Sequence, residues 1–283
     1  MSTISVATIT HNSSELIGLC LGSVQWADEI VVVDGMSTDN TVEICNSFPT
    51  VNVIVVPNNH NLDVNKNIAI DNCRGDWVLV LDSDEVVTPE LAEELRRTAE
   101  SGGNGKSGFF LPRRNYFLGR WMKSSGWYPD HVLRFFQRAK GRFPCDHVHE
   151  RLELEGEAGY LSGDLLHYTY RDFGEYFMKM DRYTSFEARY MLRLSEELDS
   201  VTFLDFLRNK AQRKPFIRKI WWKYAPLKPF LRFLLIYFAR KGFLDGRHGL
   251  MLAILSGFSD YVSLEKHRLL KEREGSFSEA ADA

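Results

Sequence analysis

The sequence has few of the features that mark secreted or membrane-spanning proteins. Its 283 residues include only four cysteines, with no Cys-x-x-Cys pair and no spacing typical of a zinc site, which favours buried thiols in a reducing compartment. No run of about 18 apolar residues predicts a membrane-spanning helix. The N-terminus lacks the basic flank and apolar core of a signal peptide. We therefore expect a cytoplasmic protein whose core needs no disulfides.

The net charge of −3 is small, but the charges are unevenly distributed. Residues 1–205 contain 19 basic and 31 acidic residues, whereas residues 206–241 contain 11 basic residues and no acid. Trp221 and Trp222 lie among these basic residues, a composition typical of a helix on an anionic membrane surface. The alternative is a cationic helix that packs on the acidic part of the chain. That acidic part argues against nucleic acid as the partner.

Short apolar runs alternate with helix-forming segments over the first hundred residues. Strands are expected at residues 4–10, 29–35, 51–57 and 76–82, and helices at about 13–24, 40–47, 63–73 and from Thr88 onward. Because these strands are apolar on both faces, they predict a doubly wound, mostly parallel α/β sheet covered by helices. Ligands of such sheets bind beyond the carboxyl ends of the strands.

Acidic residues directly follow the fourth predicted strand. Asp82, Asp84 and Glu85 come after the apolar run at 78–81. Hard divalent cations such as Mg²⁺ and Mn²⁺ prefer oxygen ligands, and two carboxylates two residues apart can face one ion, with a diphosphate completing the coordination. The alternative is a solvated acidic helix start, because acids favour helix N-termini, and we expect that role for Glu85.

Polar residues also follow the first two predicted strands. Thr10 and Asn12 lie at the end of the first, and Asp34 ends the second. The Asp34 carboxylate could accept hydrogen bonds from a base or a ribose. Asp39 could do the same, but it is equally consistent with the N-cap of the next helix. Lys66 could approach a phosphate or a base, although a lone helical lysine is usually solvated.

As a set, the segments TITHN, VVVDGMSTDNT, NKN and LVLDSDE resemble the family 2 inverting glycosyltransferases. The resemblance implies a GT-A-type fold that binds a nucleotide sugar. It also implies that Thr10 and Asn12 lie near the nucleotide and that Asp34 contacts the uridine. Asp82 and Asp84 then form the DxD pair of the family, of which the second binds the metal.

The middle and end of the chain resemble a narrower group, the bacterial lipopolysaccharide inner-core β-1,4-glucosyltransferases. The segments that carry this likeness are RFFQRAKGRFPCDHVHERL, LLHYTYRDFGEYFMKMDRY and KGFLDGRHGLMLAILSGF. The likeness implies a UDP-glucose donor and a heptose acceptor on a lipid-anchored core. Lys66 stands where family 2 members often have arginine.

An inverting transfer needs a carboxylate that takes the proton from the attacking hydroxyl. Family 2 members usually place this base in a Glu-Asp pair, and the sequence departs from that pattern. We expect the base to be Glu150, with Asp146 and Asp130 as alternatives. Glu150 could instead form a salt bridge to Arg151 or Arg134.

Three further side chains are candidates for substrate or metal contacts. His149 could hold the acceptor or a phosphate, and Trp127 could stack on a sugar ring. His167 follows an apolar strand and could supply a late metal or diphosphate ligand. Each has a structural alternative, namely a hydrogen-bonded core residue for either histidine and simple packing for the tryptophan.

These observations predict a metal-dependent, inverting glycosyltransferase. It would move a hexose, glucose by resemblance, from a UDP-sugar to a glycolipid, the lipopolysaccharide inner core by resemblance. A capsule or lipid-linked oligosaccharide is the alternative acceptor. A non-catalytic nucleotide-sugar binder is a rival. A nucleotidyltransferase is another, although the Gly-rich loop of that class is missing after the first strand.

The chain is predicted to have three parts. A catalytic domain is expected at residues 1–198, with a donor half at about 1–100 and an acceptor and base half at about 101–170. Residues 199–271 are expected to form a basic, apolar helical extension. This extension would dock peripherally on the inner face of the cytoplasmic membrane. Residues 272–283 are expected to be a frayed tail.

Overall fold

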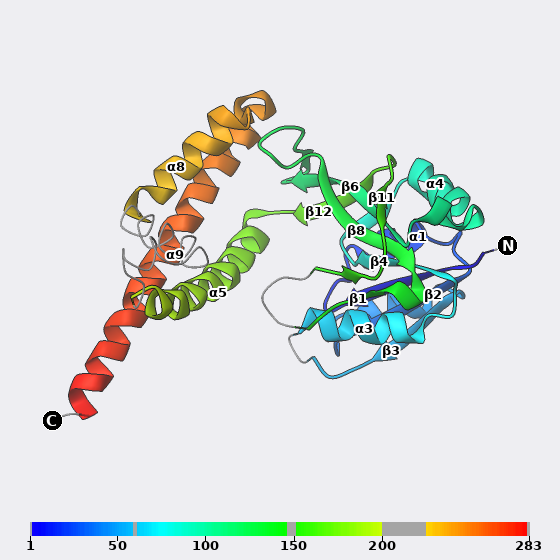
Figure 1. The fold of residues 1–283 in the computed structure, drawn as a ribbon, viewed down its shortest axis with the longest axis horizontal. Helices are drawn as coiled ribbons and strands as arrows, with labels where there is room; N and C mark the ends of the chain where they lie inside the picture. The colour runs from blue at the N-terminus through cyan, green and yellow to red at the C-terminus, as the bar shows by residue number, and fades with distance from the viewer. Residues whose placement is uncertain (1, 59–60, 146–150, 200–224, 282–283) are drawn as a thin grey trace, which may run out of the picture. The chain divides into compact units, whose positions relative to one another are not determined.

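The structure is a computed structural model that describes residues 2–58, 61–145, 151–199 and 225–281. The chain divides into two compact units. The first consists of Met1–Tyr116 and Trp127–Thr169, and the second consists of Phe117–Gly126 and Tyr170–Ala283. Each unit is described by itself, with the elements labelled as in Figure 1.

The first unit is built on a mixed, mostly parallel sheet with the strand order β3-β2-β1-β4-β8-β6-β12-β5. Its parallel part consists of β1 (Ile4–Thr10), β2 (Glu29–Asp34), β3 (Val51–Val55) and β4 (Trp77–Asp82). In the register of these strands Thr10 is paired with Asp34, and Ile9 is paired with Asp82. The carboxyl ends of β1, β2 and β4 therefore meet at one edge, as the sequence predicts.

Helices cover both faces of this sheet. They are α1 (Ile17–Gly22), α2 (Thr41–Asn46), α3 (Leu62–Asn72) and α4 (Pro89–Glu100). Residues of α1, α2 and α4 share one hydrophobic core with alternate strand residues, and α3 packs in a second core on the opposite face. The doubly wound α/β architecture is confirmed, because strand residues such as Val31 and Val32 are buried on opposite faces.

The ends of two helices show how local chemistry sets their bounds. Thr88 Oγ1 accepts a hydrogen bond from Leu91 N, and Pro89 occupies the first turn, so α4 begins as the sequence predicts. Helix α1 is shorter than expected. The N–H groups of Ser13 and Ser14 donate to the side chains of Thr41 and Asp39, which are outside α1.

The rest of the first unit is largely antiparallel. Its strands are β5 (Glu85–Val87), β6 (Gly108–Phe117), β8 (Asp130–Gln137), β9 (Gly141–Arg142), β10 (Glu153–Leu154), β11 (Ala158–Tyr160) and β12 (Leu165–Tyr170). Strand β8 runs antiparallel to both β4 and β6, and β12 runs antiparallel to β5. This part therefore brings side chains from residues 108–170 to the sheet that carries the acidic turn.

The second unit is mostly helical. It contains β7 (Arg120–Trp121), α5 (Phe173–Asp199), α8 (Lys228–Leu234), the π-helical turn η5 (Leu235–Ala239), the short turn η6 (Gly242–Asp245) and α9 (Gly246–Ala281). Helix α9 packs against both α5 and α8. A side chain on Gly257 of α9 would come within 2.6 Å of the Pro229 carbonyl oxygen, so glycine permits the close approach of α8.

Part of the predicted basic extension, residues 200–224, lies outside the described residues. Among the helices that the structure describes, none combines the length and the apolar character needed to cross a bilayer.

Candidate active site

The loops after β1, β2 and β4 are joined at the carboxyl edge of the sheet. Asn12 Oδ1 accepts hydrogen bonds from Thr38 N at 2.8 Å and Thr38 Oγ1 at 3.3 Å, and Asn12 N donates to Ser37 Oγ at 2.8 Å. Ser83 Oγ donates to Ser13 Oγ at 3.0 Å, which links the acidic turn to the first loop. Asn12 has a φ of 50°, a left-handed conformation that asparagine tolerates well. These contacts form a continuous polar rim.

Two carboxylates that were predicted to bind the nucleotide hold the loops of this rim in place. Asp34 is fully buried, and its oxygens accept hydrogen bonds from the N–H and the hydroxyl of Ser37. Asp39 is exposed and accepts hydrogen bonds from Ser14 N and from the N–H and hydroxyl of Thr41. Desolvation opposes ionisation, but these hydrogen bonds outweigh it and lower the pKa of Asp39 to about 2. Asp39 therefore joins two loops as an ionised carboxylate.

Asp82 is held between two basic side chains. Lys66 Nζ lies 3.2 Å from Asp82 Oδ1, and Arg134 Nη2 contacts Oδ2. Burial alone would raise the pKa of Asp82, but Arg134 and Lys66 outweigh it and hold that pKa well below its usual range. The Lys66 side chain is only 2% exposed, so the solvated role considered for this residue is wrong.

Glu85 has a role that differs from the one expected. It is the first residue of β5 and is fully buried, whereas α4 begins only at Pro89, so its expected place at the helix start is wrong. Glu85 Oε1 lies 3.3 Å from Arg113 Nη1 and 3.2 Å from Arg134 Nη2. A carboxylate at such depth is costly unless it is paired and hydrogen-bonded, which these two arginines achieve.

The network continues from Arg113 to His167. Arg113 Nη2 lies 2.6 Å from Asp130 Oδ2, which also accepts a hydrogen bond from Asn115 Nδ2 at 3.3 Å. The other end of the Asn115 amide, Oδ1, lies 2.6 Å from His167 Nδ1. His167 Nε2 then lies 3.7 Å from Asp84 Oδ2. Polar contacts therefore run without a break from Lys66 to Asp84.

The hydrogen bonds of Asn115 determine the tautomer of a neutral His167. Asn115 Nδ2 donates to Trp127 O at 3.0 Å and to Asp130, which assigns Oδ1 as the acceptor that faces His167. His167 Nδ1 must then carry the proton, and Nε2 directs a lone pair toward Asp84. A carboxylate oxygen and an unprotonated imidazole nitrogen are both ligands of divalent cations.

A site for a divalent ion at this pair would be only partly built from protein. Among the described residues, no group of three or more His, Cys, Asp or Glu side chains converges as a metal site. Asp84 and His167 supply two donors, and both Asp82 oxygens contact basic side chains. Mg²⁺ typically takes one or two protein carboxylates and completes its shell with waters and substrate phosphates, so the donor set fits an ion that binds together with a diphosphate.

Three predicted residues, Glu150, Asp146 and His149, lie outside the described residues. Trp127 is half-buried, and its carbonyl joins the network through Asn115. Arg113 and Asn115 were missed from the sequence. They lie two positions apart on one face of β6, but Arg114 stands between them, so the sequence shows a run of three polar residues and no alternation that could have found them.

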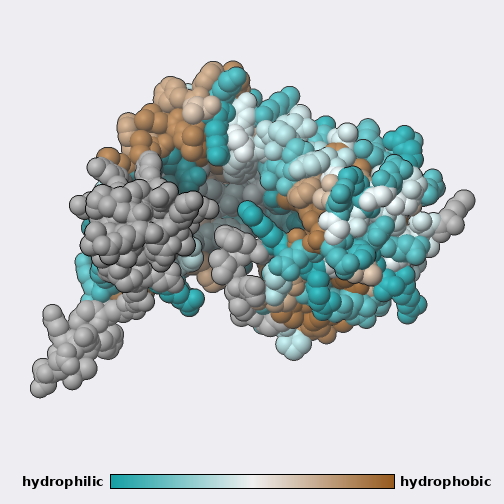
Figure 2. Space-filling view, viewed as in Figure 1, coloured by the Kyte–Doolittle hydropathy of each residue, from teal (hydrophilic) through white to brown (hydrophobic). Residues whose placement is uncertain are grey.

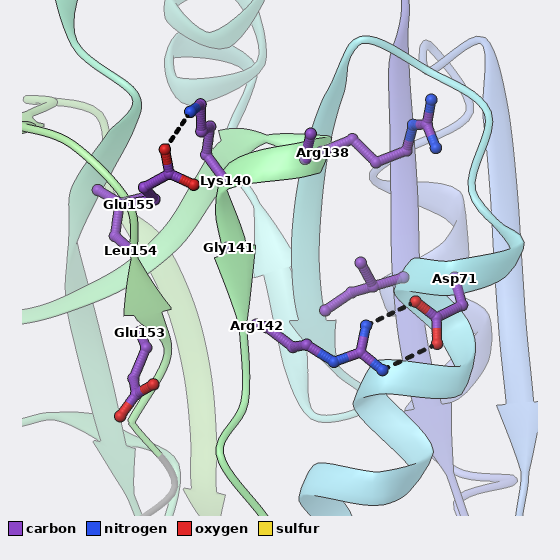
Figure 3. A pocket seen from close by; sticks show the side chains of 10 residues that line it. Asp71, Arg138, Lys140, Gly141, Arg142, Glu153, Leu154 and Glu155 are labelled. Atoms are coloured by element: carbon purple, nitrogen blue, oxygen red, sulfur yellow. Dashed lines mark hydrogen bonds and ion pairs between the residues drawn. The ribbon is translucent and has the colours of Figure 1, made fainter.

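A pocket of about 590 Å³ lies away from this edge (Figure 3). Its lining includes Arg138, Lys140 and Arg142, which follow the end of β8 where Gln137 is paired with Trp77 at the amino end of β4. Arg142 pairs with Asp71 at 2.8 Å, and Lys140 pairs with Glu155 at 2.5 Å (Figure 3). None of the predicted site residues lines this pocket.

The fold defines the class of the protein. The mannosyltransferase PcManGT from Pyrobaculum calidifontis, solved in complex with GDP-Man and Mn²⁺, matches 94% of this chain and 87% of its own with a TM-score of 0.52 at 13% identity. The chain therefore has the GT-A-type fold, with C-terminal helices.

The sequence assigns the family. Residues 5–152, more than half of the chain, match the model of glycosyl transferase family 2, and the chain belongs to this family of glycosyltransferase enzymes. The lipopolysaccharide core biosynthesis glycosyltransferase LpsC of Rhizobium meliloti is 28% identical over 65% of this chain and 70% of its own length. The glycosyltransferase RT0209 of Rickettsia typhi is 25% identical over 95% of this chain and 88% of its own length.

Proposed function

We propose that the enzyme transfers a hexose from a UDP-sugar to a glycolipid, with inversion at the anomeric carbon. The observation that carries this proposal is the pairing of Asp84 with His167 at the same sheet edge as the loops that follow β1 and β2. Sheets of this kind bind nucleotides at that edge. On this proposal, the edge would combine two metal donors with a place for a nucleotide diphosphate.

The nucleotide is proposed to bind on the rim that contains Asn12, Ser37 and Thr38. Thr10 is a candidate contact, because its buried hydroxyl has no hydrogen-bond partner among the described residues. Asp34 is fully buried, so we propose that it orders the loop after β2 through Ser37 and contacts the uridine only indirectly.

Charged residues around the rim are proposed to hold the loops in place for the donor. Asp39 joins the loops after β1 and β2 through Ser14 and Thr41. Lys66 and Asp82 form an ion pair at the start of the acidic turn. These residues fix the backbone from which Asp84 projects.

Asp84 and His167 are proposed to hold Mg²⁺ or Mn²⁺. Metal-binding histidines usually donate their second ring N–H to a fixed acceptor, and Asn115 Oδ1 lies 2.6 Å from His167 Nδ1. When bound, the ion would neutralise charge on the departing UDP. Asp82 was also predicted as a ligand, but its two oxygens face basic side chains, and we propose that it orients the turn.

Glu150 is proposed as the base, with Asp146 as its alternative. The base takes the proton of the acceptor hydroxyl while that oxygen bonds to the anomeric carbon and the bond from that carbon to UDP breaks. Asp130 is the less suitable candidate, because its Oδ2 already accepts hydrogen bonds from Arg113 Nε, Arg113 Nη2 and Asn115 Nδ2. His149 and Trp127 are proposed to contact the acceptor sugar.

The donor and the acceptor rest on similarity. The likeness to inner-core glucosyltransferases supports glucose as the sugar, and the name of LpsC supports a lipopolysaccharide core as the acceptor. A capsule or lipid-linked oligosaccharide is the alternative acceptor. We propose that the enzyme works on the inner face of the cytoplasmic membrane, where it meets a lipid-anchored acceptor.

The test is a matrix of donors, metals and acceptors. Purified enzyme is mixed with UDP-glucose, UDP-galactose or GDP-mannose, with Mg²⁺, Mn²⁺ or EDTA, and with or without inner-core glycolipid. Release of the nucleoside diphosphate, UDP or GDP according to the donor, and the anomeric configuration of the product are then measured. We expect release that needs UDP-glucose, metal and acceptor together. Full turnover in EDTA would refute the metal, and turnover with GDP-mannose alone would refute the donor.

A further inference from the structure

Asp245 links two segments of the second unit through hydrogen bonds. Its carboxylate accepts hydrogen bonds from Lys123 N at 3.1 Å, from Ser124 N at 3.1 and 3.3 Å, and from Ser125 Oγ at 2.8 Å. Ser125 N also donates to Arg240 O at 2.9 Å. Residues 118–126 and 238–247 therefore form one structure, which we call the hairpin tip because it includes the turn between α8 and α9.

The surface of the hairpin tip is strongly basic. Its exposed basic residues are Arg120, Lys123, Arg240, Lys241 and Arg247. Its only acid, Asp245, is 3% exposed, and the hydrogen bonds described above satisfy its carboxylate. The one carboxylate of the hairpin tip is thus buried, and the basic side chains are exposed to solvent.

Neighbouring contacts confirm that these charges are gathered in one place. A side chain on Gly126 would meet the Arg240 guanidinium, and one on Gly246 would lie 3.9 Å from Arg120 Nη1. His248 lies close enough to these charges to be affected by them. Burial, together with Arg247 and Arg120, lowers the pKa of His248.

Large apolar side chains are exposed in the middle of this basic surface. Phe238 is 56% exposed, Phe243 47% and Leu244 60%. Leu231 of α8 and Leu235 of η5, which precede these residues in the chain, are exposed as well. Figure 2 shows hydrophobic surface at the position that α8 occupies in Figure 1, bordered by hydrophilic residues. Exposed apolar groups of this size mark interaction sites.

We propose that the hairpin tip docks on an anionic lipid bilayer. Phe243 and Leu244 would enter the headgroup region, and the five basic side chains would contact lipid phosphates. Apolar side chains among long basic ones suit this boundary, because lysine and arginine extend along apolar surface while their charges stay in water. The proposal rests on the proposed function only in that a bilayer would hold the glycolipid acceptor.

Two other partners fit the hairpin tip less well. A second copy of the chain, placed by a twofold axis on the same patch, would bring five positive charges against five others. Other proteins usually meet surfaces that are poor in lysine at the centre of the contact. Both remain outcomes that the experiment can reveal.

The experiment uses the full chain and sedimentation with vesicles of phosphatidylcholine, with or without phosphatidylglycerol. The charge variant is R240Q/K241Q, matched by R74Q/R97Q, which removes two exposed basic residues of the first unit. The apolar variant is F243S/L244S, matched by L19S/V55S, which removes two exposed apolar side chains elsewhere. Thermal unfolding confirms that each variant is folded.

We expect tight binding only to vesicles that contain phosphatidylglycerol. R240Q/K241Q should weaken that binding roughly 30-fold, from about a factor of five for each basic residue. F243S/L244S should weaken it as well, and neither control should do so. Equal binding to both kinds of vesicle, or a charge variant that matches its control, would overturn the proposal. So would a dimer in solution that only F243S/L244S dissociates.

This result can be separated from a failure of the proposed transfer. UDP release with a detergent-dispersed acceptor reports on the first unit and should be unchanged in the hairpin-tip variants. Normal docking without UDP release would refute the transfer alone. Normal UDP release would leave the transfer standing. If the hairpin-tip variants then sedimented with the vesicles as well as their controls do, the docking alone would be refuted.

Discussion

His167 Nε2 lies 3.7 Å from Asp84 Oδ2, although the two residues are far apart in the sequence. The main chain sets this distance. Strand β12 pairs with β5 so that His167 is opposite Glu85, and Tyr168 N donates to Asp84 O at 2.9 Å. The pair is therefore held in place by the pairing of β12 with β5 and by this hydrogen bond, and its side chains need little reorganisation to share one ligand.

Replacing Asp84 with asparagine should nearly abolish transfer without unfolding the protein. On the proposed role, Asp84 holds the ion that stabilises negative charge on the departing UDP, an effect of several kcal/mol, so UDP release should fall by a factor of about 100 to 1,000. Steady-state UDP release measures the loss, and far-ultraviolet circular dichroism checks the fold. Asp71→Asn, at the pocket near the amino end of β4, is the control. Near wild-type turnover of Asp84→Asn would show that the metal assignment is wrong.

Replacing Asn115 with leucine should weaken metal binding while leaving Asp84 and His167 in the chain. Asn115 is a positioning residue, because its amide fixes the imidazole through His167 Nδ1. Loss of such a partner typically lowers metal affinity about 10- to 100-fold. Titration of Mn²⁺ by calorimetry gives the affinity directly. High Mn²⁺ should restore turnover to Asn115→Leu but not to Asp84→Asn. A variant with unchanged Mn²⁺ affinity would remove Asn115 from this role.

Replacing Glu85 with alanine should destabilise the protein strongly. The change leaves Arg113 and Arg134 without a buried carboxylate that both contact, a loss of about 3–5 kcal/mol in the free energy of unfolding. Glu157→Ala is the matched control, because it breaks an exposed pair with Lys106, which solvent screens, and should cost far less. Urea unfolding measures both values. Similar costs for the two variants would contradict the buried network.

The contribution of Asp39 to stability should depend on pH in one direction. Its folded pKa of about 2 is below the ordinary value of 3.8, so its hydrogen bonds stabilise the fold fully above pH 4. That contribution should disappear as the pH falls through 2. Urea unfolding of wild type and Asp39→Asn at a series of pH values gives the difference. A difference that grows on acidification would show that the carboxylate is not held in its ionised form.

The parallel half of the first unit could be predicted from sequence because its signals are local. Apolar runs marked β1, β2 and β4, and the rule for parallel sheets then placed Asp34 and Asp84 at one edge. Strand β12 contributed His167 as a candidate for the same reason, since it follows an apolar run.

The charged interior could not be predicted in the same way. Glu85 follows two acids and precedes a helix, so the rule for helix starts was applied, while pairing of β5 with β12 decided its true position. Arg134 reaches Asp82 because β8 runs antiparallel to β4, a register that no local pattern encodes. Lys66 looked like a surface lysine because the burial of a helix face depends on what packs against it.

The order in which the chain is synthesised has a consequence for the contacts of Arg134. Asp82 and Glu85 are synthesised early, but the arginines that neutralise them lie on β6 and β8, which follow about thirty to fifty residues later. A fragment that ends after α4 would contain every strand of the nucleotide edge, but it would lack both arginines and the strands β8 and β12 that pair with β4 and β5. The donor half should therefore not be separable as a stable module, and truncation after residue 100 should yield an unfolded product.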